Sequence, residues 1–267
     1  MRGISTSRYV NTDRYPIENL DSTAAKQLIE SSRSQMEKTG ALELPEFLSQ
    51  EGLETILREC AAIESLAYWS RVNGNAYLTP TDPTVPVDHP LRMTDDTALA
   101  VVAYDQFPST SPLRQLYEWD PLMRFIGAAL GLDEIHRYAD PMGGLNLAVM
   151  RDGDYLRWHF DQTDFVTTIA LQTASKGGEF EYVPKIRGPG RENYDQVRLA
   201  LKGDHPGVVT IENAPGSLVL FQGRYSLHRV KPVHGNRSRW IALLGYDTKP
   251  GVVSSDHLRR MRYGRVK

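Results

Sequence analysis

The spacing of apolar positions divides the chain into a helical first part and a β-rich second part. In the first part, apolar residues recur at intervals of three and four behind residues that cap helices well. The predicted helices follow Asp21-Ser22 as far as Lys38, follow Ser49 through Ile63, and lie between Asp120-Pro121 and Gly131. The segment from Tyr77 to Pro90 is rich in Pro, Thr and Asp, and it is predicted to be irregular.

From Gly144 onward the pattern changes to short segments rich in Val, Ile, Leu, Phe, Tyr and Thr, most of them separated by turn residues. The candidate strands are Leu145–Met150, Tyr155–Phe160, Phe165–Thr173, Glu179–Val183, Val208–Glu212, Ser217–Phe221, Leu227–Val230 and Trp240–Tyr246. About eight short strands without intervening helices predict two packed antiparallel sheets. The expected fold is therefore mainly β with N-terminal helices, a cupin-like jelly roll or double-stranded β-helix.

This pattern also predicts how the chain is organised. Residues 1–143 are expected to form a helical and irregular region that packs on the barrel, and residues 144–267 the jelly-roll core, the two making one folded domain. A long insertion, 184–206, interrupts the strands. Its middle, Asn193 to Leu201, is predicted to form a short helix over the barrel mouth.

The composition of the chain indicates a globular protein and argues against several other classes. Of 267 residues, 40% are hydrophobic and 24% charged, which is typical of a globular protein with a real core. The net charge of −2 does not favour binding to nucleic acid or to an anionic membrane. The opening MRGISTSRYVNTDRYP lacks the apolar stretch of a secretory signal, and one cysteine, Cys60, cannot form an internal disulfide. Both features predict a cytoplasmic protein.

A candidate metal site begins at Trp158-His159-Phe160-Asp161, near the end of a predicted strand. Side chains at i and i+2 of a strand point to the same face, so His159 and Asp161 can reach one point inside the barrel. A third ligand is expected from a later strand nearby, and His228 qualifies because it follows the strand Ser217–Phe221 and a Gly-Arg-Tyr-Ser turn. Two imidazoles and one carboxylate on one face of iron(II) leave three positions open for a bidentate ligand and oxygen.

The alternatives at this site are an ordinary polar pair and a different histidine or arginine. A lone His-x-Asp is common on surface strands, but the β-rich context, the later histidine and a following arginine favour a metal site. His234 is the rival of His228, although it lies in a turn. Arg239 and Arg237 follow His228 by eleven and nine positions and share the same strand parity. Because a planar guanidinium binds a carboxylate in bidentate fashion, Arg239, which leads into an apolar strand, is predicted to bind the distal carboxylate of 2-oxoglutarate, with Arg237 as competitor.

Several motifs carry a resemblance to a known family. The chain resembles the 2-oxoglutarate-dependent oxygenase superfamily at His159-x-Asp161, Gly177-Gly178-Glu179-Phe180, Gly216-Ser217-Leu218, and His228-x-Val230-x-Pro232-Val233-x-Gly235 with the arginines after it. It also resembles a narrower group, the radical halogenases of free lysine and their amino-acid hydroxylase relatives, at Trp158-His159-Phe160-Asp161, at Phe221 to Val230 and at Arg262-Tyr263-Gly264-Arg265. The resemblance covers most of the chain after about Thr39.

This resemblance implies a function. It implies Fe(2+) held by His159, Asp161 and His228, with 2-oxoglutarate and O2 as cosubstrates. Halogenases of this type carry a small residue at the position of Asp161, which leaves a coordination site for chloride. With a carboxylate at that position, the resemblance implies hydroxylation of an unactivated C–H bond of a free amino acid or close derivative, with succinate and carbon dioxide as co-products.

Substrate contacts are the least constrained part of the prediction. Asp164, Gln172 and Glu181 are polar groups near the barrel mouth that could bind a substrate ammonium, although each also fits a solvated or strand-capping role. Arg92 and Tyr263 are substrate contacts by resemblance alone. The rival functions are desaturation, another small-metabolite substrate, or a non-catalytic jelly-roll metal-binding or sensor protein, which would lack the carboxylate-binding arginine.

Overall fold

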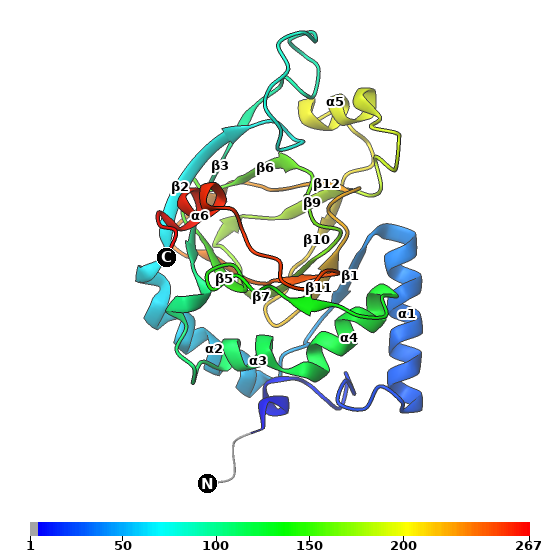
Figure 1. Ribbon diagram of the computed structural model, residues 1–267, viewed down its shortest axis with the longest axis vertical. Helices are drawn as coiled ribbons and strands as arrows, with labels where there is room; N and C mark the ends of the chain where they lie inside the picture. The colour runs from blue at the N-terminus through cyan, green and yellow to red at the C-terminus, as the bar shows by residue number, and fades with distance from the viewer. Residues whose placement is uncertain (1–4) are drawn as a thin grey trace.

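The computed structural model describes residues 5–267, and its centre is a pair of antiparallel sheets that face each other (Figure 1). The larger sheet has the order β1 (Ala41–Leu44), β11 (Leu218–Phe221), β7 (Val166–Gln172), β14 (Arg239–Leu244), β5 (Leu145–Met150), β3 (Asp95–Val102) and β2 (Tyr68–Gly74). The smaller sheet has the order β10 (Val209–Ile211), β9 (Phe180–Val183), β12 (Leu227–Val230) and β6 (Leu156–His159). The prediction of a mainly β fold is confirmed, and all eight predicted strands form within two residues of their expected bounds, except that the last one ends as a separate short strand.

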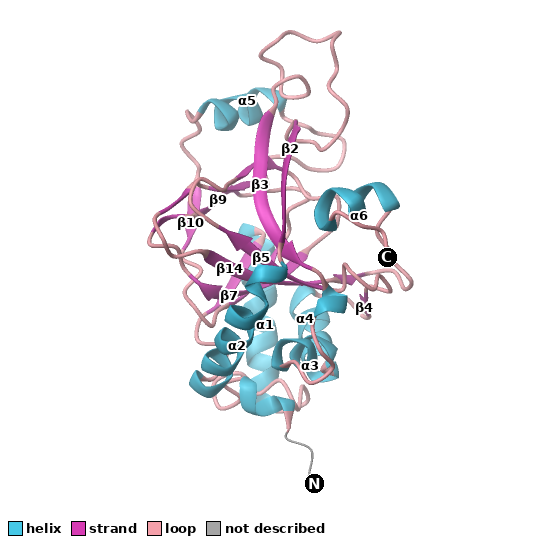
Figure 2. Ribbon diagram, turned by 90° about the vertical axis from the view of Figure 1, so that its left-hand side faces the viewer, coloured by secondary structure: helices cyan, strands magenta, loops and turns pink. Residues whose placement is uncertain are grey.

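Four helices cover the outer face of the larger sheet (Figures 1 and 2). They are α1 (Thr23–Thr39), α2 (Gln50–Ile63), α3 (Pro112–Glu118) and α4 (Asp120–Leu130). The Ser22 hydroxyl caps α1 by accepting from Ala25 N at 3.2 Å, and Ser49 caps α2 in the same way. Gly40 ends α1 with φ of 71°, a left-handed conformation in which glycine avoids the strain of a side chain. The apolar faces of these helices meet one face of β5, β7 and β14 to form the main core.

The remaining elements are short. Within residues 5–267, 3-10 helices occur at Thr6–Tyr9, Glu64–Leu66 and Tyr104–Gln106. Two small sheets pair β8 (Lys176–Gly177) with β13 (Val233–His234) and β4 (His136–Arg137) with β15 (Tyr246–Asp247).

The insertion forms the predicted short helix, α5 (Tyr194–Lys202), but this helix covers the outer face of the smaller sheet. Leu227 alternates on β12 with His228, which points into the barrel, so the side chain of Leu227 points outward. Burial of such outward apolar residues explains the position of the helix. The residues in this contact are Val197 and Ala200 of α5 with Trp158, Val183 and Leu227.

The first part of the chain contains more than the predicted helices. It supplies β1, β2 and β3 of the larger sheet, none of which was predicted. A further helix, α6 (Asp256–Tyr263), was also not predicted, and it packs on β2 and β3. Residues 5–143 are therefore part of the barrel wall as well as a helical layer against it.

Among residues 5–267, none of the helices combines the length and the apolar character needed to cross a membrane. The first four residues of the opening segment, MRGISTSRYVNTDRYP, lie outside the described part of the chain.

Candidate metal centre

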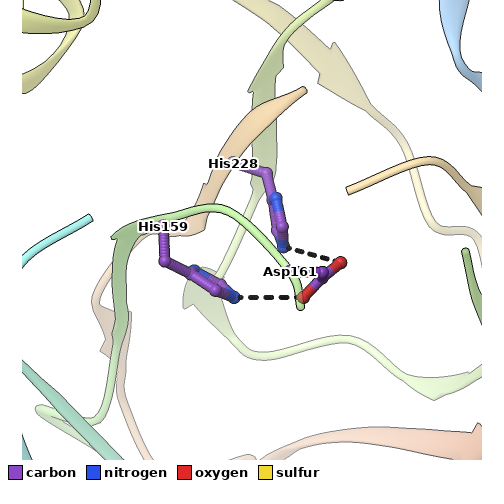
Figure 3. Close-up of side chains that lie close together, drawn as sticks. All are labelled: His159, Asp161 and His228. Atoms are coloured by element: carbon purple, nitrogen blue, oxygen red, sulfur yellow. Dashed lines mark ion pairs between the residues drawn. The ribbon is translucent and has the colours of Figure 1, made fainter. Parts of the chain in front are cut away.

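The three predicted metal ligands lie together inside the barrel (Figure 3). His159 is the last residue of β6, and its pairing partner on the neighbouring strand β12 is His228. Asp161 follows β6 by two residues, on the same side as His159. The carboxylate oxygens of Asp161 lie 3.7 Å from Nε2 of His159 and 3.5 Å from Nε2 of His228, and one ligand atom from each residue fits within 4.8 Å of the others.

Both histidines are oriented by the backbone. Nδ1 of His159 lies 2.9 Å from the carbonyl oxygen of Arg157, and Nδ1 of His228 lies 3.0 Å from that of Ser226. A carbonyl oxygen only accepts hydrogen bonds, so each Nδ1 must carry the proton as donor. The lone pair is then on Nε2, which faces Asp161 in each case (Figure 3). This backbone contact is how metal-binding imidazoles are commonly held.

The Asp161 carboxylate fits a metal ion better than a closed protein contact. Its Oδ2 atom is buried without a hydrogen-bond partner among residues 5–267, although Nε2 of His228 lies nearby. A buried, unpaired carboxylate oxygen is costly unless a cation compensates for it. Gly223 contacts this carboxylate so closely that a Cβ there would lie 1.7 Å from Oδ2. The donor set of two imidazoles and one carboxylate is the one that open iron(II) sites use.

The charge state of the cluster also suits a metal. Burial, and then the neighbouring His228, lower the pKa of His159 to about 3, so its imidazole is neutral at physiological pH. Burial opposes the charged form of Asp161. His228, His159 and Arg262 outweigh this effect and hold the pKa of the Asp161 carboxyl below its ordinary value. The neutral imidazole of His159 and the ionised carboxylate of Asp161 are the forms that bind a divalent cation.

The two candidate arginines occupy different environments. The guanidinium of Arg239, at the start of β14, is buried, and its only hydrogen-bond partner among residues 5–267 is Met150 Sδ at 3.8 Å. Burial lowers the pKa of Arg239 to about 10, so it is still charged at neutral pH. In contrast, Arg237 is exposed and donates to Thr173 O at 2.8 Å and to the Thr173 hydroxyl at 3.0 Å. Of the two, Arg239 is the buried, charged group without an anionic partner among residues 5–267. It is therefore the better candidate to bind a carboxylate.

The other predicted site residues are dispersed. Asp164 pairs with Arg224 at 2.6 Å, and Gln172 donates to Ser238 O at 2.9 Å. Glu181 pairs with Arg229 at 2.7 Å. Arg92 donates to Val85 O at 3.0 Å, within the loop between β2 and β3.

Tyr263 differs from these residues because it is buried and reaches toward the barrel. Its hydroxyl donates to Asn146 Oδ1 at 2.9 Å, and Asn146 alternates on β5 with residues that face the helices, so it faces the barrel interior. His234 is exposed, and its Nδ1 lies 4.0 Å from Asp152.

Sequence reasoning missed some residues near the centre. Asn146 was not singled out, and Gly223 and Arg262 were named only inside family motifs, with no role predicted for either. Gly223 contacts Asp161, and the charge of Arg262 lowers the pKa of the Asp161 carboxyl. One signal was available for Asn146, because it is the only polar residue in the strand sequence LNLAVM. Gly223 comes close to Asp161 only in the folded chain, and the local sequence pattern does not predict this contact.

The comparison with known proteins decides the family. The profile of the family described as Halogenase D matches residues 24–257. The chain belongs to the Halogenase D family. No curated protein sequence matches it.

Solved structures show the same fold at low sequence identity. A 2OG-Fe(II) oxygenase family oxidoreductase from Burkholderia pseudomallei is 17% identical, with a TM-score of 0.52 over 84% of this chain and 92% of that one. A prolyl hydroxylase from Trichoplax adhaerens, in complex with a hypoxia inducible factor peptide fragment, is 16% identical, with a TM-score of 0.56 over 84% and 90%. The epimerase SnoN, in complex with Fe3+, alpha ketoglutarate and nogalamycin RO, is 13% identical, with a TM-score of 0.57 over 83% and 84%. These likenesses confirm the predicted jelly roll of the 2-oxoglutarate oxygenases.

Proposed function

We propose that this member of the Halogenase D family is a non-haem iron dioxygenase that uses Fe(2+), 2-oxoglutarate and O2. In this proposal it hydroxylates an unactivated C–H bond of a free amino acid or close derivative, with succinate and carbon dioxide as co-products. The observation that carries the proposal is the buried Asp161 carboxylate within 3.7 Å of both histidine Nε2 atoms, with one oxygen unpaired in the described chain. When bound, iron and 2-oxoglutarate supply the oxidising chemistry.

The chain's own residues have three tasks in this reaction. His159 and His228 hold the metal through Nε2, because their Nδ1 atoms are engaged with the backbone. Arg239 binds the distal carboxylate of 2-oxoglutarate, since its guanidinium is buried and charged. The barrel interior excludes water, which strengthens these electrostatic contacts.

Asp161 favours hydroxylation over the activity for which the family is named. The halogenases that this chain resembles have a small residue at this position, and chloride takes the coordination place of the carboxylate. In this chain the carboxylate fills that place and also supplies the negative charge that chloride would bring. Gly223 leaves room for the carboxylate, because any larger residue there would collide with it.

A free amino acid as substrate is supported by the resemblance to lysine-type enzymes and by polar groups on the inner wall. The buried pair Tyr263 and Asn146 offers a hydroxyl and an amide inside the barrel, next to Arg262 of α6. These groups suit a substrate with both a carboxylate and polar atoms. The buried, unpaired thiol of Cys60 favours a reducing compartment, the cytoplasm.

The test is product mass spectrometry across the amino acids with and without chloride, for wild type and Asp161→Gly. Wild type is expected to add oxygen to its substrate and release succinate even in abundant chloride. Asp161→Gly is expected to lose most hydroxylation and gain little or no chlorination, because a halide also needs neighbouring groups that stabilise it. A chlorinated product from wild type would overturn the hydroxylase proposal. Metal binding without succinate formation from any tested substrate would favour a non-catalytic protein.

A further inference from the structure

Of the three metal ligands, Asp161 is the one that lies outside a strand (Figure 3). β6 ends at His159 and β7 begins at Val166, so Asp161 belongs to the irregular segment 160–165. The two histidines are oriented by contacts of Nδ1 with backbone carbonyl oxygens, whereas Oδ2 of Asp161 has no hydrogen-bond partner among residues 5–267. The direction of this carboxylate therefore depends on how the segment 160–165 is held.

Arg224 contacts this segment from the turn that precedes β12. Its Nε donates to Oδ1 of Asp164 at 2.6 Å, and its Nη2 donates to the carbonyl oxygen of Gln162. These two acceptors follow Asp161 closely in the sequence, so the planar guanidinium spans the bend directly behind the ligand. A hydrogen bond from Asp161 N to Gly223 O at 3.1 Å joins the same two segments.

The turn that carries Arg224 also contacts the metal ligands through its backbone. A Cβ on Gly223 would lie 1.7 Å from Oδ2 of Asp161 and 2.9 Å from Cε1 of His228. The same turn leads directly into β12, which carries His228. A shift of this turn relative to the segment 160–165 would therefore change the distance between two ligands.

The insertion 184–206 holds the backbone of Arg224 in turn. Nε of Arg187 donates to Arg224 O at 2.7 Å, and Nη1 of Arg187 pairs with Glu192 at 3.0 Å. The Arg187 guanidinium also lies 3.9 Å from the ring centroid of Phe160, the first residue of the ligand-bearing segment. The insertion thus contacts both the turn and the segment that Arg224 joins.

The exposure of the ion pair favours a positioning role over a stabilising one. The side chains of Arg224 and Asp164 are 38% and 61% exposed. An exposed ion pair contributes little to the free energy of folding, because water and salt screen it. In contrast, removal of a group that orients a metal ligand typically lowers metal affinity or activity by about ten- to a hundredfold. Loss of Arg224 should therefore affect metal binding much more than folding.

We propose that Arg224 is a positioning residue for the metal ligand Asp161. It fixes the segment 160–165 so that the carboxylate stays within reach of the ion that the two histidines bind. Asp164 is then the partner that holds the guanidinium in place. The inference rests on the metal site of the proposed function, but it concerns metal affinity and requires neither substrate nor turnover.

The experiment is titration of metal-free, full-length protein with cobalt(II), followed by visible absorption, which reports affinity and coordination geometry together. His228→Ala defines how much of the signal belongs to this site. We expect Arg224→Ala to weaken cobalt binding about tenfold or more and to change the absorption bands of the bound ion. Arg224→Lys should restore part of the affinity, because an ammonium replaces the planar guanidinium only in part.

Asp164→Ala tests the same contact while the arginine is kept. It should weaken cobalt binding less than Arg224→Ala does, because the contact of Arg224 with Gln162 O remains. Combining Asp164→Ala with Arg224→Ala should add little further loss, since both changes remove the same ion pair.

Arg229→Ala is the matched control. Arg229 is 34% exposed and pairs with Glu181 at 2.7 Å. It follows His228 on β12, but it alternates with that ligand and so lies on the outer face of the smaller sheet. Arg229→Ala should bind cobalt as wild type does, and metal-free Arg224→Ala and Arg229→Ala should unfold at similar urea concentrations.

The inference is overturned if Arg224→Ala and Asp164→Ala bind cobalt with the affinity and spectrum of wild type, or if Arg229→Ala loses as much affinity as Arg224→Ala. Wild type that binds no cobalt beyond the level of His228→Ala would remove the metal centre itself, and with it both the proposed function and this inference. Wild type that binds cobalt without forming succinate would contradict the proposed function alone.

Discussion

Asp161 is expected to destabilise the metal-free fold and to serve as a metal ligand. Its carboxylate is buried in the barrel with an unpaired oxygen among the described residues, an arrangement that costs free energy in the metal-free protein. Opposing imidazoles and the backbone of Gly223 hold it in one place. A divalent cation would remove the cost, so metal binding is expected to stabilise the fold as well as enable the reaction.

The first prediction at this scale concerns the metal ligands. His228→Ala removes one of two imidazole ligands, so iron binding and succinate formation are expected to be lost. His234→Ala should keep both, because His234 is exposed and lies in the separate pair β8–β13. Iron content of purified protein, together with a succinate assay, measures the effect. Loss of iron from His234→Ala and its retention by His228→Ala would show that the ligand assignment is wrong.

The second prediction concerns the cosubstrate. Arg239→Ala removes a charge-assisted pair of about 1.5–3 kcal/mol, so the apparent affinity for 2-oxoglutarate should fall by about tenfold or more. Arg237→Ala is the control, because that side chain already donates to Thr173 at the surface. Titration of 2-oxoglutarate against succinate formation distinguishes the two. A defect confined to Arg237→Ala would transfer the role to that residue.

Residues of the site were predictable where strand parity decides their direction. His159 and Asp161 follow from the i, i+2 rule, and His228 follows from its place in a later strand. Arg157 has the same parity as His159, yet its guanidinium donates hydrogen bonds to Val72 O on β2 and to the Thr97 hydroxyl on β3. Those strands are about 60 to 85 positions away in the sequence. Local patterns carry no information about such approaches.

At the scale of elements, the strands from Leu145 onward were predicted because each alternates or is apolar between turn residues. β2 and β3 were not predicted. β2 reads YWSRVNG, an edge strand whose side chains are largely exposed, and β3 opens with two aspartates before its buried end. Neither has the pattern of a half-buried strand. They form strands because β2 pairs with β3 and β3 pairs with β5. α6 was missed for a related reason, since DHLRRMRY carries few apolar positions.

Asp140 binds the segment before α6 through hydrogen bonds. Its ionisation is expected to make the free energy of unfolding depend on pH. Its buried carboxylate accepts from Met142 N at 2.9 Å, Gly143 N at 3.1 Å and Ser254 N at 2.7 Å, and it pairs with Arg259 at 3.3 Å. Burial favours its neutral form, but these donors prevail and hold the pKa of Asp140 below its ordinary value. The unfolded chain then binds this proton more readily, so the carboxylate's contribution to stability is complete above the unfolded pKa and is lost as pH falls through the folded one.

The measurement is urea unfolding of metal-free wild type and Asp140→Asn from about pH 7 to about pH 3. Asp140→Asn should lower the free energy of unfolding by about 1–3 kcal/mol at neutral pH. The gap between the two proteins should narrow as the pH falls below about 4. A gap that stays constant across this range would mean that the charge of Asp140 does not stabilise the fold.

At the scale of the whole molecule, one core joins the two predicted regions. Helices α1 and α2 of the first part bury their apolar faces against β5, β7 and β14 of the second part. Cys60 lies in this shared core, where its side chain is 0% exposed and burial raises the pKa of its thiol. Because the chain has a single cysteine, reaction of this thiol reports when the helical layer leaves the sheet.

The last prediction uses that thiol to test whether residues 1–267 unfold as one domain. A disulfide reagent should modify Cys60 in native buffer only through rare opening, since the thiolate is disfavoured and its access blocked. In rising urea, labelling should increase together with the tryptophan fluorescence change of a variant with Trp69 and Trp119 replaced by Phe, in which the remaining Trp158 and Trp240 lie in the barrel strands β6 and β14. One shared transition is expected because separating α2 from the sheet exposes the core that both regions need. Complete labelling at a urea concentration where the tryptophan signal is still native would mean that the helical region is a separate folding unit.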